Sequence, residues 1–337
     1  MLLAAASRSH ELSERLQLAP RLGIGLAALG RPGYINLGHQ EDLESTERSV
    51  EGMRDLTHAV LDEAYSLGIR YFDCARSYGL SEEFAGSWLA LHPEATDVVV
   101  GSKWGYEYTA AWRVKVGGGE AHEVKKHTVE QLEQQLKETH ERLPWLDLYQ
   151  IHSATQESGV LRSHEVLKVL STLREGGCSV GLSVSNPQVP TIVEAINIRE
   201  GERPLFSSVQ ATFNLLDQSA APALREAAEA GMLVIVKEAL ANGRLTARAP
   251  SSAGLVLLQQ EADALDTTVD ALALAWVMSH PWVGMCLSGA ATVEQLRSNA
   301  DSLRLVPLEP ELHSRLSESL AQRPDEYWQD RKSLSWN

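Results

Sequence analysis

The chain contains 337 residues, of which 44% are hydrophobic, so it is long enough to bury a sizeable core. Asp and Glu number 45 against 30 Lys and Arg, which gives a formal net charge of −15. This charge disfavours phosphate backbones and anionic lipid surfaces, so we expect neither nucleic acid nor a membrane as a partner. Cys74, Cys178 and Cys286 are far apart and form no CxxC pair, which argues against a disulfide framework and against a zinc site.

The first residues, MLLAAASRSHELSERL, do not have the pattern of a targeting segment. Their apolar run extends only from Leu2 to Ala6, no basic residue precedes it, and Glu11 and Glu14 follow. No stretch of the chain approaches the roughly 20 apolar residues of a membrane helix. We therefore expect a cytoplasmic protein, and we expect no metal.

Short β-branched runs alternate with longer segments of helical periodicity, which indicates βαβ units around a parallel sheet. The expected strands are residues 21–26, 69–73, 97–103, 146–152, 180–184, 207–212, 233–238 and 283–289. The expected helices include residues 56–68, 128–143, 164–177, 222–231, 269–280 and 292–303. Eight such strands in a chain of this length favour an α/β fold with a closed (β/α)8 TIM barrel over an open sheet. We expect a single domain over residues 1–337, with a core at about 21–303 and a C-terminal helix and tail at 304–337.

Two connections are long, residues 31–52 after the first strand and residues 104–126 after the third. Long loops that follow barrel strands lie on the C-terminal face, which carries the active sites of such barrels. The tail at 325–337 contains Tyr327, Trp328 and Trp336, so it is too aromatic for simple solvated disorder.

Ionisable residues end three consecutive strands. Asp73 ends the second strand, Lys103 the third and His152 the fourth, while Tyr78 lies in the loop after Asp73. Each has an ordinary explanation on its own, as a capping carboxylate, a solvated lysine, an isolated histidine or a packed loop aromatic. Because all four belong to one face of the barrel, we interpret them together as a candidate active site.

The segment FDCARSYGLSEEFAGSWL resembles the signature FDTAxxYGxSE of the aldo-keto reductase family, with Cys74 in place of the usual threonine. GSK and DLYQIH resemble the lysine and histidine strands of that family, and the similarity extends over about residues 21–303. The resemblance implies reduction of an aldehyde or ketone by hydride transfer from NAD(P)H. It also implies a catalytic tetrad of Asp73, Tyr78, Lys103 and His152.

Those residue types suit that reaction. The alkoxide left by hydride transfer must be protonated, and a phenol with a pKa of roughly 10 donates poorly near neutrality. We expect Lys103 to lower the pKa of Tyr78 and Asp73 to hold Lys103 in place. His152 can donate a hydrogen bond to the substrate oxygen as negative charge develops there.

The dinucleotide signature of Rossmann folds is absent, because GIGLAALG at 23–30 has the spacing GxGxxxxG. SVQATFNLL resembles the family's VQxxYNLL, which implies that Gln210 binds the nicotinamide carboxamide. LSVSNPQV resembles the GVSNF region, where a serine and an asparagine do the same. Counting back from the next helix selects Ser185 and Asn186, which we favour, whereas counting from the strand selects Ser183 as a reserve. The alternative is that Ser185 or Asn186 only caps a helix.

VIVKEALANGRL resembles the family's AYSPLxxGxL turn, which binds the pyrophosphate through backbone groups, and this implies roles for Glu238, Leu240 and Gly243. Lys237 falls where many members have a tyrosine stacked on the nicotinamide. The lysine stem can cover the ring but loses aromatic stacking. The alternative is that Lys237 points away and pairs with an acid.

LSGAATVEQLRSN resembles the family segment that binds the adenosine 2′-phosphate. Gly289 replaces a lysine and Gln295 replaces an arginine there, while Asn299 retains the usual adenine-side residue. The resemblance places NADP ahead of NAD, which stays possible because two basic groups are missing.

Aromatic residues in the loops are candidate walls of the substrate pocket, although such residues also simply pack. They are Tyr34, Trp104, Tyr106, Trp112 and Trp328. Two alternatives to a carbonyl reductase stay open at this point: a cofactor-binding regulatory or redox-sensing barrel with slow turnover, and a dehydrogenase that oxidises a sugar or alcohol. The sequence indicates no particular small-molecule carbonyl substrate and no oligomeric state.

Overall fold

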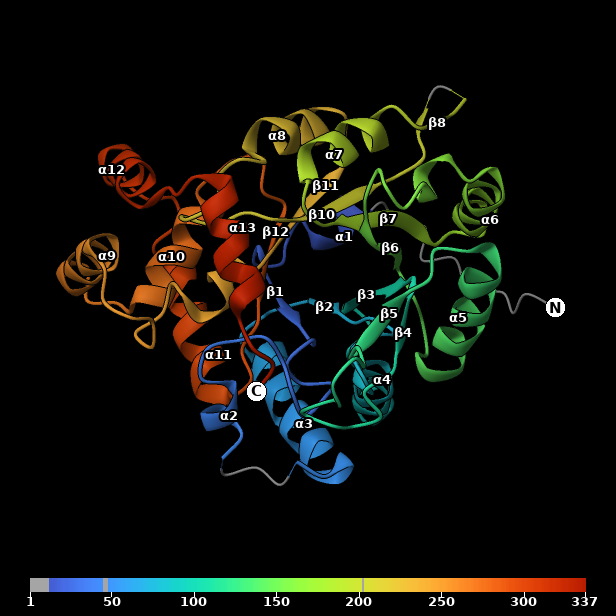
Figure 1. The fold of residues 1–337 in the computed structure, drawn as a ribbon, viewed down its shortest axis with the longest axis horizontal. Coiled ribbons are helices and arrows are strands. Elements are labelled where there is room, and N and C mark those ends of the chain that lie inside the picture. The colour runs from blue at the N-terminus through green and yellow to red at the C-terminus, as the bar shows by residue number, and fades with distance from the viewer. Residues whose placement is uncertain (1–11, 45–47, 202) are drawn as a thin grey trace.

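The computed structural model describes residues 12–44, 48–201 and 203–337, so the interpretation of residues 1–11 as lacking a targeting segment lies outside the described part. Eight parallel strands close into a barrel in the order β1-β12-β11-β10-β7-β6-β3-β2. Figure 1 shows the helices arranged around this barrel, which confirms the predicted fold class.

Each predicted barrel strand is present. The strands are β1 (Leu22–Gly25), β2 (Tyr71–Asp73), β3 (Val99–Trp104), β6 (Leu148–Ala154), β7 (Ser179–Val184), β10 (Ser208–Thr212), β11 (Leu233–Lys237) and β12 (Met285–Ser288). They are almost wholly buried, as expected for parallel strands covered on both faces. The register pairs Asp73 with Gly101 and Lys103 with Gln150, so the ends of neighbouring strands lie close together.

The outer layer consists of α3 (Val50–Ser66), α4 (Ser81–Leu91), α5 (Val129–Arg142), α6 (His164–Glu175), α7 (Gln188–Ile196), α8 (Ala221–Glu229), α10 (Val269–Met278) and α11 (Val293–Ala300). Six of the helices from α3 to α11 have a Ser or Thr at the N-cap, and α9 (Ala253–Ala264) is one of them. The hydroxyl of this cap accepts a hydrogen bond from a backbone N–H of the first turn, as at Ser49, Thr128 and Thr292. The helix expected at 56–68 begins at Val50 because Ser49 caps it.

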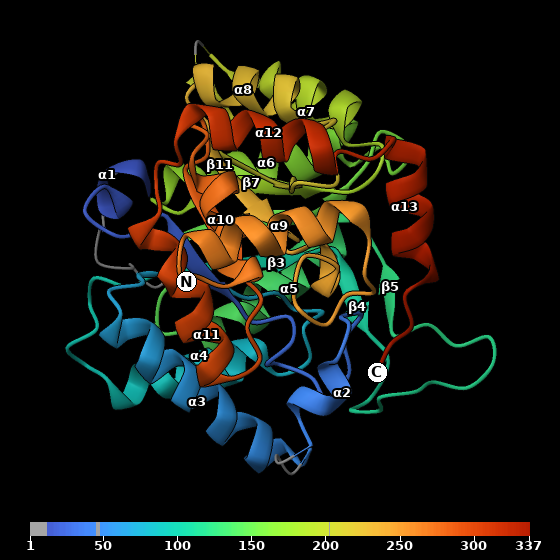
Figure 2. The ribbon, with the colours of Figure 1, turned by 90° about the vertical axis from the view of Figure 1, so that its left-hand side faces the viewer.

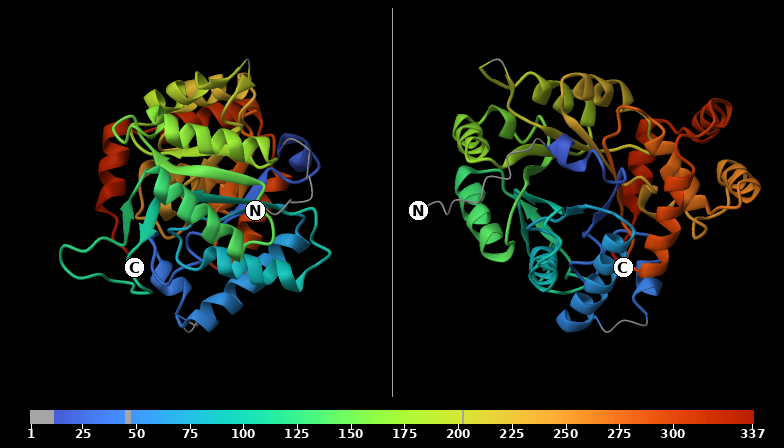
Figure 3. Two further views of the ribbon diagram at one scale, coloured as in Figure 1. Left: turned by 90° about the vertical axis from the view of Figure 1, so that its right-hand side faces the viewer. Right: turned by 180° about the vertical axis from the view of Figure 1, so that it is seen from behind.

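Further helices lie outside this layer: α9, α12 (Pro310–Leu320) and α13 (Pro324–Ser333). The short helix α1 (Leu12–Leu16) packs Leu12 and Leu16 against Tyr71, Val99 and Leu148 of the barrel strands. The rear view in Figure 3 shows this blue helix lying across one end of the barrel. No helix within the described ranges is both long and apolar enough to span a bilayer.

Both long connections follow barrel strands as expected. The first contains α2 (His39–Asp42), and the second forms a hairpin of β4 (Tyr106–Tyr108) and β5 (Glu123–Lys125). The connection between these two strands projects from the body of the molecule in the left view of Figure 3. Helix α13 stands on the same side of the molecule as the hairpin in Figure 2. The chain end then pairs with the first connection, because Tyr34 and Asn337 exchange two backbone hydrogen bonds of 3.1 and 3.2 Å.

Candidate active site

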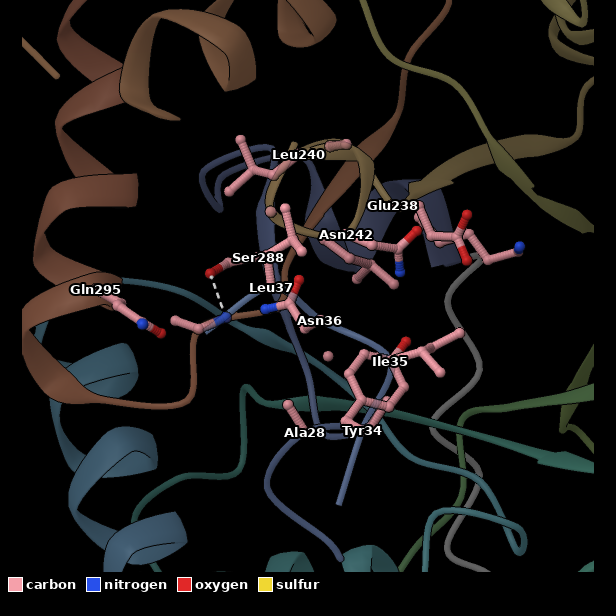
Figure 4. A pocket seen from close by; sticks show the side chains of 18 of the residues that line it. Ala28, Tyr34, Ile35, Asn36, Leu37, Glu238, Leu240, Asn242, Ser288 and Gln295 are labelled. Atoms are coloured by element: carbon pink, nitrogen blue, oxygen red, sulfur yellow. Dashed lines mark hydrogen bonds between the residues drawn. The ribbon is translucent and has the colours of Figure 1, made fainter. Parts of the chain in front are cut away.

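A cavity of about 450 Å³ lies at the carboxyl ends of the barrel strands. Its lining residues include the ends of β1, β2, β6, β10, β11 and β12, parts of the first long connection and parts of the C-terminal segment. Figure 4 shows Gln295 on one side of this cavity, with Tyr34 and Glu238 on the other. The face of the barrel predicted to carry the active site is therefore the face that is hollowed.

Asp73 and Lys103 form a buried ion pair at the base of the site. The Nζ of Lys103 is 2.5 Å from one carboxylate oxygen of Asp73, and it also donates to the carbonyl oxygen of Cys74 at 2.9 Å. The other oxygen of Asp73 accepts hydrogen bonds from the Gln210 amide at 2.9 Å and from the Tyr71 hydroxyl at 3.1 Å. Because every partner is buried, these hydrogen bonds fix the position of the ammonium.

Tyr78 lines the cavity beside this pair, with the Lys103 ammonium 4.7 Å from the centre of its ring. Burial raises the pKa of Tyr78 well above its usual value of 10, and the Asp73 carboxylate adds to the rise. Arg31, whose guanidinium carbon is 5.4 Å from the ring centre, lowers the pKa in part. The expected lowering of the Tyr78 pKa is therefore wrong, because burial dominates and the Asp73 carboxylate offsets the nearby ammonium charge.

His152 lies edge-on to Tyr78, with the ring centres 5.4 Å apart. Its Nδ1 is 3.2 Å from the hydroxyl of Ser77. Burial lowers the pKa of His152 well below its usual value of 6.5, and the charges of Lys103 and Lys237 lower it further. The imidazole is therefore neutral at pH 7. A hydrogen bond from Ser77 to Nδ1 leaves the ring proton on Nε2, where it can be donated.

The last residue of β11, Lys237, lines the cavity together with Glu238, Leu240 and Gly243 of the turn that follows. The Nζ of Lys237 donates to the Thr212 hydroxyl at 2.9 Å, and within the described residues no carboxylate lies within ion-pair distance of it. Burial lowers the pKa of Lys237. The alternative in which Lys237 points away from the cavity and pairs with an acid is therefore wrong.

The segment after β12 lines the cavity through Gly289, Gln295 and Asn299. Asn299 accepts a hydrogen bond from Ser288 at 2.7 Å and donates one to Asp270 at 2.7 Å. A Cβ atom built on Gly289 would meet no heavy atom within 4 Å, so this position opens directly onto free space.

The serine and asparagine residues predicted to bind the nicotinamide carboxamide are not among the residues that line the cavity. Ser183 is buried beside Gln210 in the register of β7 and β10, and its hydroxyl accepts the backbone N–H of Ser153 at 2.8 Å. Ser185 and Asn186 follow β7 and do not line the cavity. Neither caps a helix, since α7 begins at Gln188 with Pro187 at its N-cap, which corrects the capping alternative.

Among the predicted wall residues, Tyr34 lines the cavity, whereas the other four do not. Trp104 is fully buried and lies edge-on to His127, because neighbouring residues on a strand point to opposite faces and Lys103 takes the inward position. Tyr106 is edge-on to His152 at 5.0 Å, just behind the wall.

Trp112 and Trp328 pack within the loops instead. The Trp112 indole donates to the carbonyl oxygen of Arg48 at 2.8 Å and lies edge-on to Phe84. Trp328 is buried on α13 beside Tyr327.

Arg31 and Trp336 are among the lining residues that were not predicted as part of the wall. The guanidinium carbon of Arg31 is 4.6 Å from the ring centre of Trp336, whose other contacts include a stack on His122 at 3.9 Å. The aromatic composition of the tail was the signal for Trp336, but its contact with Arg31 joins residues more than 300 positions apart, which no local pattern reveals.

Within the part of the chain that the structure describes, the cavity contains a polar group without a hydrogen-bond partner and open space, two features expected of a coenzyme-binding site. The side-chain oxygen of Asn242 is buried, lines the cavity and has no hydrogen-bond partner among the described residues. It lies in the same turn as Leu240 and Gly243, which also border the cavity. Together with the open position at Gly289, this turn offers a polar cradle for a ligand with hydrogen-bond donors.

A model of the Aldo/keto reductase family matches residues 21–321 of the chain. The chain belongs to the aldo/keto reductase family. It is an oxidoreductase that uses a nicotinamide coenzyme and acts on small-molecule carbonyl substrates, as this family does.

Among curated relatives of this aldo/keto reductase, Protein tas of Escherichia coli K12 is 26% identical over 298 residues, covering 74% of this chain and 84% of its own. L-glyceraldehyde 3-phosphate reductase of the same organism is 25% identical over 345 residues, covering 91% and 92%. The solved structure of the aldo-keto reductase AKR11C1 from Bacillus halodurans, in its holo form, superposes with a TM-score of 0.67 at 23% identity, covering 91% of this chain and 95% of its own. That superposition supports the barrel fold.

Proposed function

We propose that the protein reduces an aldehyde or ketone to an alcohol with Tyr78 as the proton donor. The observation that carries the proposal is the meeting of Tyr78, His152 and the Asp73–Lys103 pair around one end of a cavity large enough for a small carbonyl compound. The bound nicotinamide coenzyme supplies the hydride to the carbonyl carbon. The chain's own residues then deliver the proton to the oxygen.

Each residue of the tetrad has one role in this proposal. A raised pKa keeps Tyr78 protonated throughout the neutral range, so a donor is present whenever substrate binds. Lys103 stabilises the tyrosinate left after transfer, and Asp73 holds Lys103 in position. The neutral His152 donates from Nε2 to the carbonyl oxygen and orients it toward Tyr78.

We propose that Gln210 binds the nicotinamide carboxamide through its side-chain oxygen, because its amide nitrogen already donates to Asp73. The register that pairs Ser183 with Gln210 supports Ser183 as the second contact, which reverses the preference for Ser185 and Asn186 drawn from the sequence. The turn from Lys237 to Gly243 would hold the pyrophosphate, and the segment from Gly289 to Asn299 would hold the adenosine.

We also propose a cytoplasmic enzyme built as one domain that acts on a small molecule rather than on nucleic acid. The three cysteines are buried and free, which suits a reducing compartment. The net charge of −15 disfavours a polyanionic partner.

The test is Tyr78→Phe, with oxidation of NADH and of NADPH followed against a panel of aldehydes and ketones. We expect kcat to fall by at least about a hundredfold, as for loss of a general acid, while the coenzyme Kd changes by less than about twofold. Tyr65→Phe, on α3, is the matched control and should leave kcat unchanged. A folded Tyr78→Phe protein that keeps most of its turnover would remove Tyr78 from the mechanism.

A further inference from the structure

The part of the cavity opposite Tyr34 and Glu238 is bordered by Gln295 (Figure 4). Arg248, Asp270 and Glu294 line the cavity as well, and hydrogen bonds or ion pairs connect Arg248 and Asp270 to the Gln295–Asn299 segment. Hydride transfer requires the nicotinamide to lie beside Tyr78. A dinucleotide bound in this cavity therefore places its adenosine at the end that these residues form.

Arg248, a cation at the adenosine end of the cavity, already forms an ion pair. A terminal nitrogen of Arg248 contacts a carboxylate oxygen of Asp42, and the other terminal nitrogen donates to the carbonyl oxygen of Gly38 at 3.1 Å. The same oxygen of Asp42 accepts the side-chain amide of Gln295 at 2.7 Å. The Asp42 side chain is only 1% exposed, whereas that of Arg248 is 42% exposed. Asp42 is therefore the fixed partner, and it holds Arg248 in a neutral pair.

Among the described residues at the adenosine end of the cavity, two carboxylates, Asp270 and Glu294, line the wall together with one cation, Arg248. Asp270 accepts hydrogen bonds from Ser298 at 2.8 Å and from Asn299 at 2.7 Å, but in the described ranges no cation lies within ion-pair distance of it. Glu294 is exposed at the rim in the first turn of α11. Because Asp42 neutralises the charge of Arg248, the carboxylates of Asp270 and Glu294 make the net charge of the described groups at the adenosine end negative.

We propose that this protein binds NADH in preference to NADPH and that Asp42 is the residue that sets the preference. The inference rests on the proposed function, and it reverses the order expected from the sequence. A phosphate on the adenosine ribose carries a charge of roughly −1.5 to −2 at neutral pH and would meet two unpaired carboxylates and a neutralised arginine. A ribose hydroxyl carries no charge and can donate a hydrogen bond to a carboxylate.

Because Asp42 is buried, it continues to hold Arg248 when a phosphate approaches. A surface carboxylate could rotate into solvent when a phosphate approached, but Asp42 is enclosed, and its second oxygen has no hydrogen-bond partner among the described residues. Freeing Arg248 for a phosphate would leave that buried charge without its cation, which is strongly unfavourable. Asp42 therefore acts by withholding Arg248 from the phosphate, while Asp270 and Glu294 supply the direct repulsion.

The experiment measures the Kd of NADH and of NADPH by quenching of tryptophan fluorescence in the full-length protein, without turnover. We expect NADH to bind about tenfold more tightly at low ionic strength, with the gap narrowing as KCl screens the charges. Asp42→Asn keeps the side-chain shape and frees Arg248, so it should shift the NADH-to-NADPH affinity ratio toward NADPH by about tenfold. In the double variant Asp42→Asn, Arg248→Met, most of that shift should disappear.

Two further variants keep the test decisive. Glu63→Gln removes a carboxylate that pairs with Arg297 on the outer side of α11, away from the cavity, and should leave the ratio unchanged. Glu294→Gln, at an exposed position, should shift the ratio toward NADPH by about twofold even if Asp42→Asn does not fold. Tighter binding of NADPH by the wild type, or an unchanged ratio in both folded variants, would overturn the inference. Failure of both coenzymes to bind would instead contradict the proposed function.

Discussion

Arg331 on α13 binds Glu238 at the end of β11 through two nitrogens. Its Nε lies 3.0 and 3.1 Å from the two carboxylate oxygens, and a terminal nitrogen lies 2.5 Å from one of them. The Glu238 side chain is 7% exposed and that of Arg331 is 25% exposed. Burial alone would raise the pKa of Glu238, but the charges of Lys237 and Arg331 outweigh it and bring the pKa to about 2. The C-terminal helix is thereby fastened to the cavity wall.

Arg331→Met should lower the free energy of unfolding at pH 7 by about 2 kcal/mol, since it leaves a buried carboxylate without its closest cation. The folded pKa of Glu238 is below its ordinary value of 4.5, so the pair stabilises the fold above pH 4.5. That contribution is lost as the pH falls from 4.5 toward 2. Urea unfolding at pH 7 and pH 3 should therefore show a smaller difference between variant and wild type at pH 3.

Arg323→Met is the control for Arg331→Met, because Arg323 forms an exposed pair with Glu326 on the same helix. It should change the unfolding midpoint little. An equal loss of stability at both pH values in Arg331→Met would assign the effect to packing rather than to charge.

The local pattern of the sequence was sufficient for the barrel and for the residues at its strand ends. Parallel strands buried on both faces are continuous apolar runs, and their ends meet at one edge, so Asp73, Lys103 and His152 could be grouped from the sequence alone. Contacts between distant segments were not predictable in this way. The pairing of Arg248 with Asp42 joins residues 206 positions apart, and no local sequence pattern indicates that Asp42 is buried or that the two residues meet.

Trp104 shows a different limit. Its aromatic side chain at a strand end suggested a pocket wall, but the alternation of side chains along β3 sends it outward once Lys103 points inward. The inward face of β3 was fixed by the assignment of Lys103, so this error could have been avoided from the sequence.

Lys237→Tyr tests how the nicotinamide is held. Lys237 lines the cavity, and its ammonium is tethered to Thr212. An aromatic ring at this position should stack on the nicotinamide and strengthen binding by about 0.5–1.5 kcal/mol, or several-fold in Kd for both coenzymes. Isothermal titration calorimetry gives the Kd values, with Lys137→Tyr on the exposed face of α5 as the control. Equal or weaker binding of both coenzymes by folded Lys237→Tyr would refute stacking.

Trp336→Ala tests the C-terminal wall at the catalytic end of the cavity. The Trp336 ring covers the guanidinium of Arg31, which in turn lies near the Tyr78 ring. Removing the indole opens this side to water, so KM for carbonyl substrates should rise by about fivefold to tenfold while the Kd of the coenzyme stays unchanged. Ser335→Ala, at the exposed neighbouring position, should alter neither constant. A parallel loss of coenzyme affinity would show that Trp336 supports the whole cavity rather than the substrate end.

His39→Phe should make the protein less sensitive to mild acid. His39 is fully buried against Tyr34, and within the described residues neither ring nitrogen has a hydrogen-bond partner. Burial lowers its pKa from 6.5 to about 4, so the unfolded chain takes up a proton below pH 6.5 that the folded protein refuses until about pH 4. His39 therefore lowers stability progressively as the pH falls through this window.

Phenylalanine keeps the ring and removes the titration, so His39→Phe should match the wild type near pH 7.5 and exceed it by about 2 kcal/mol at pH 4.5. Urea unfolding at half-unit steps between these values measures the difference directly. His164→Phe, at the exposed first position of α6, is the control for replacing a histidine with phenylalanine at a position that solvent reaches. If the curves for His39→Phe and the wild type ran parallel from pH 7.5 to 4.5, His39 would have to be protonated inside the fold, with a partner for its charge.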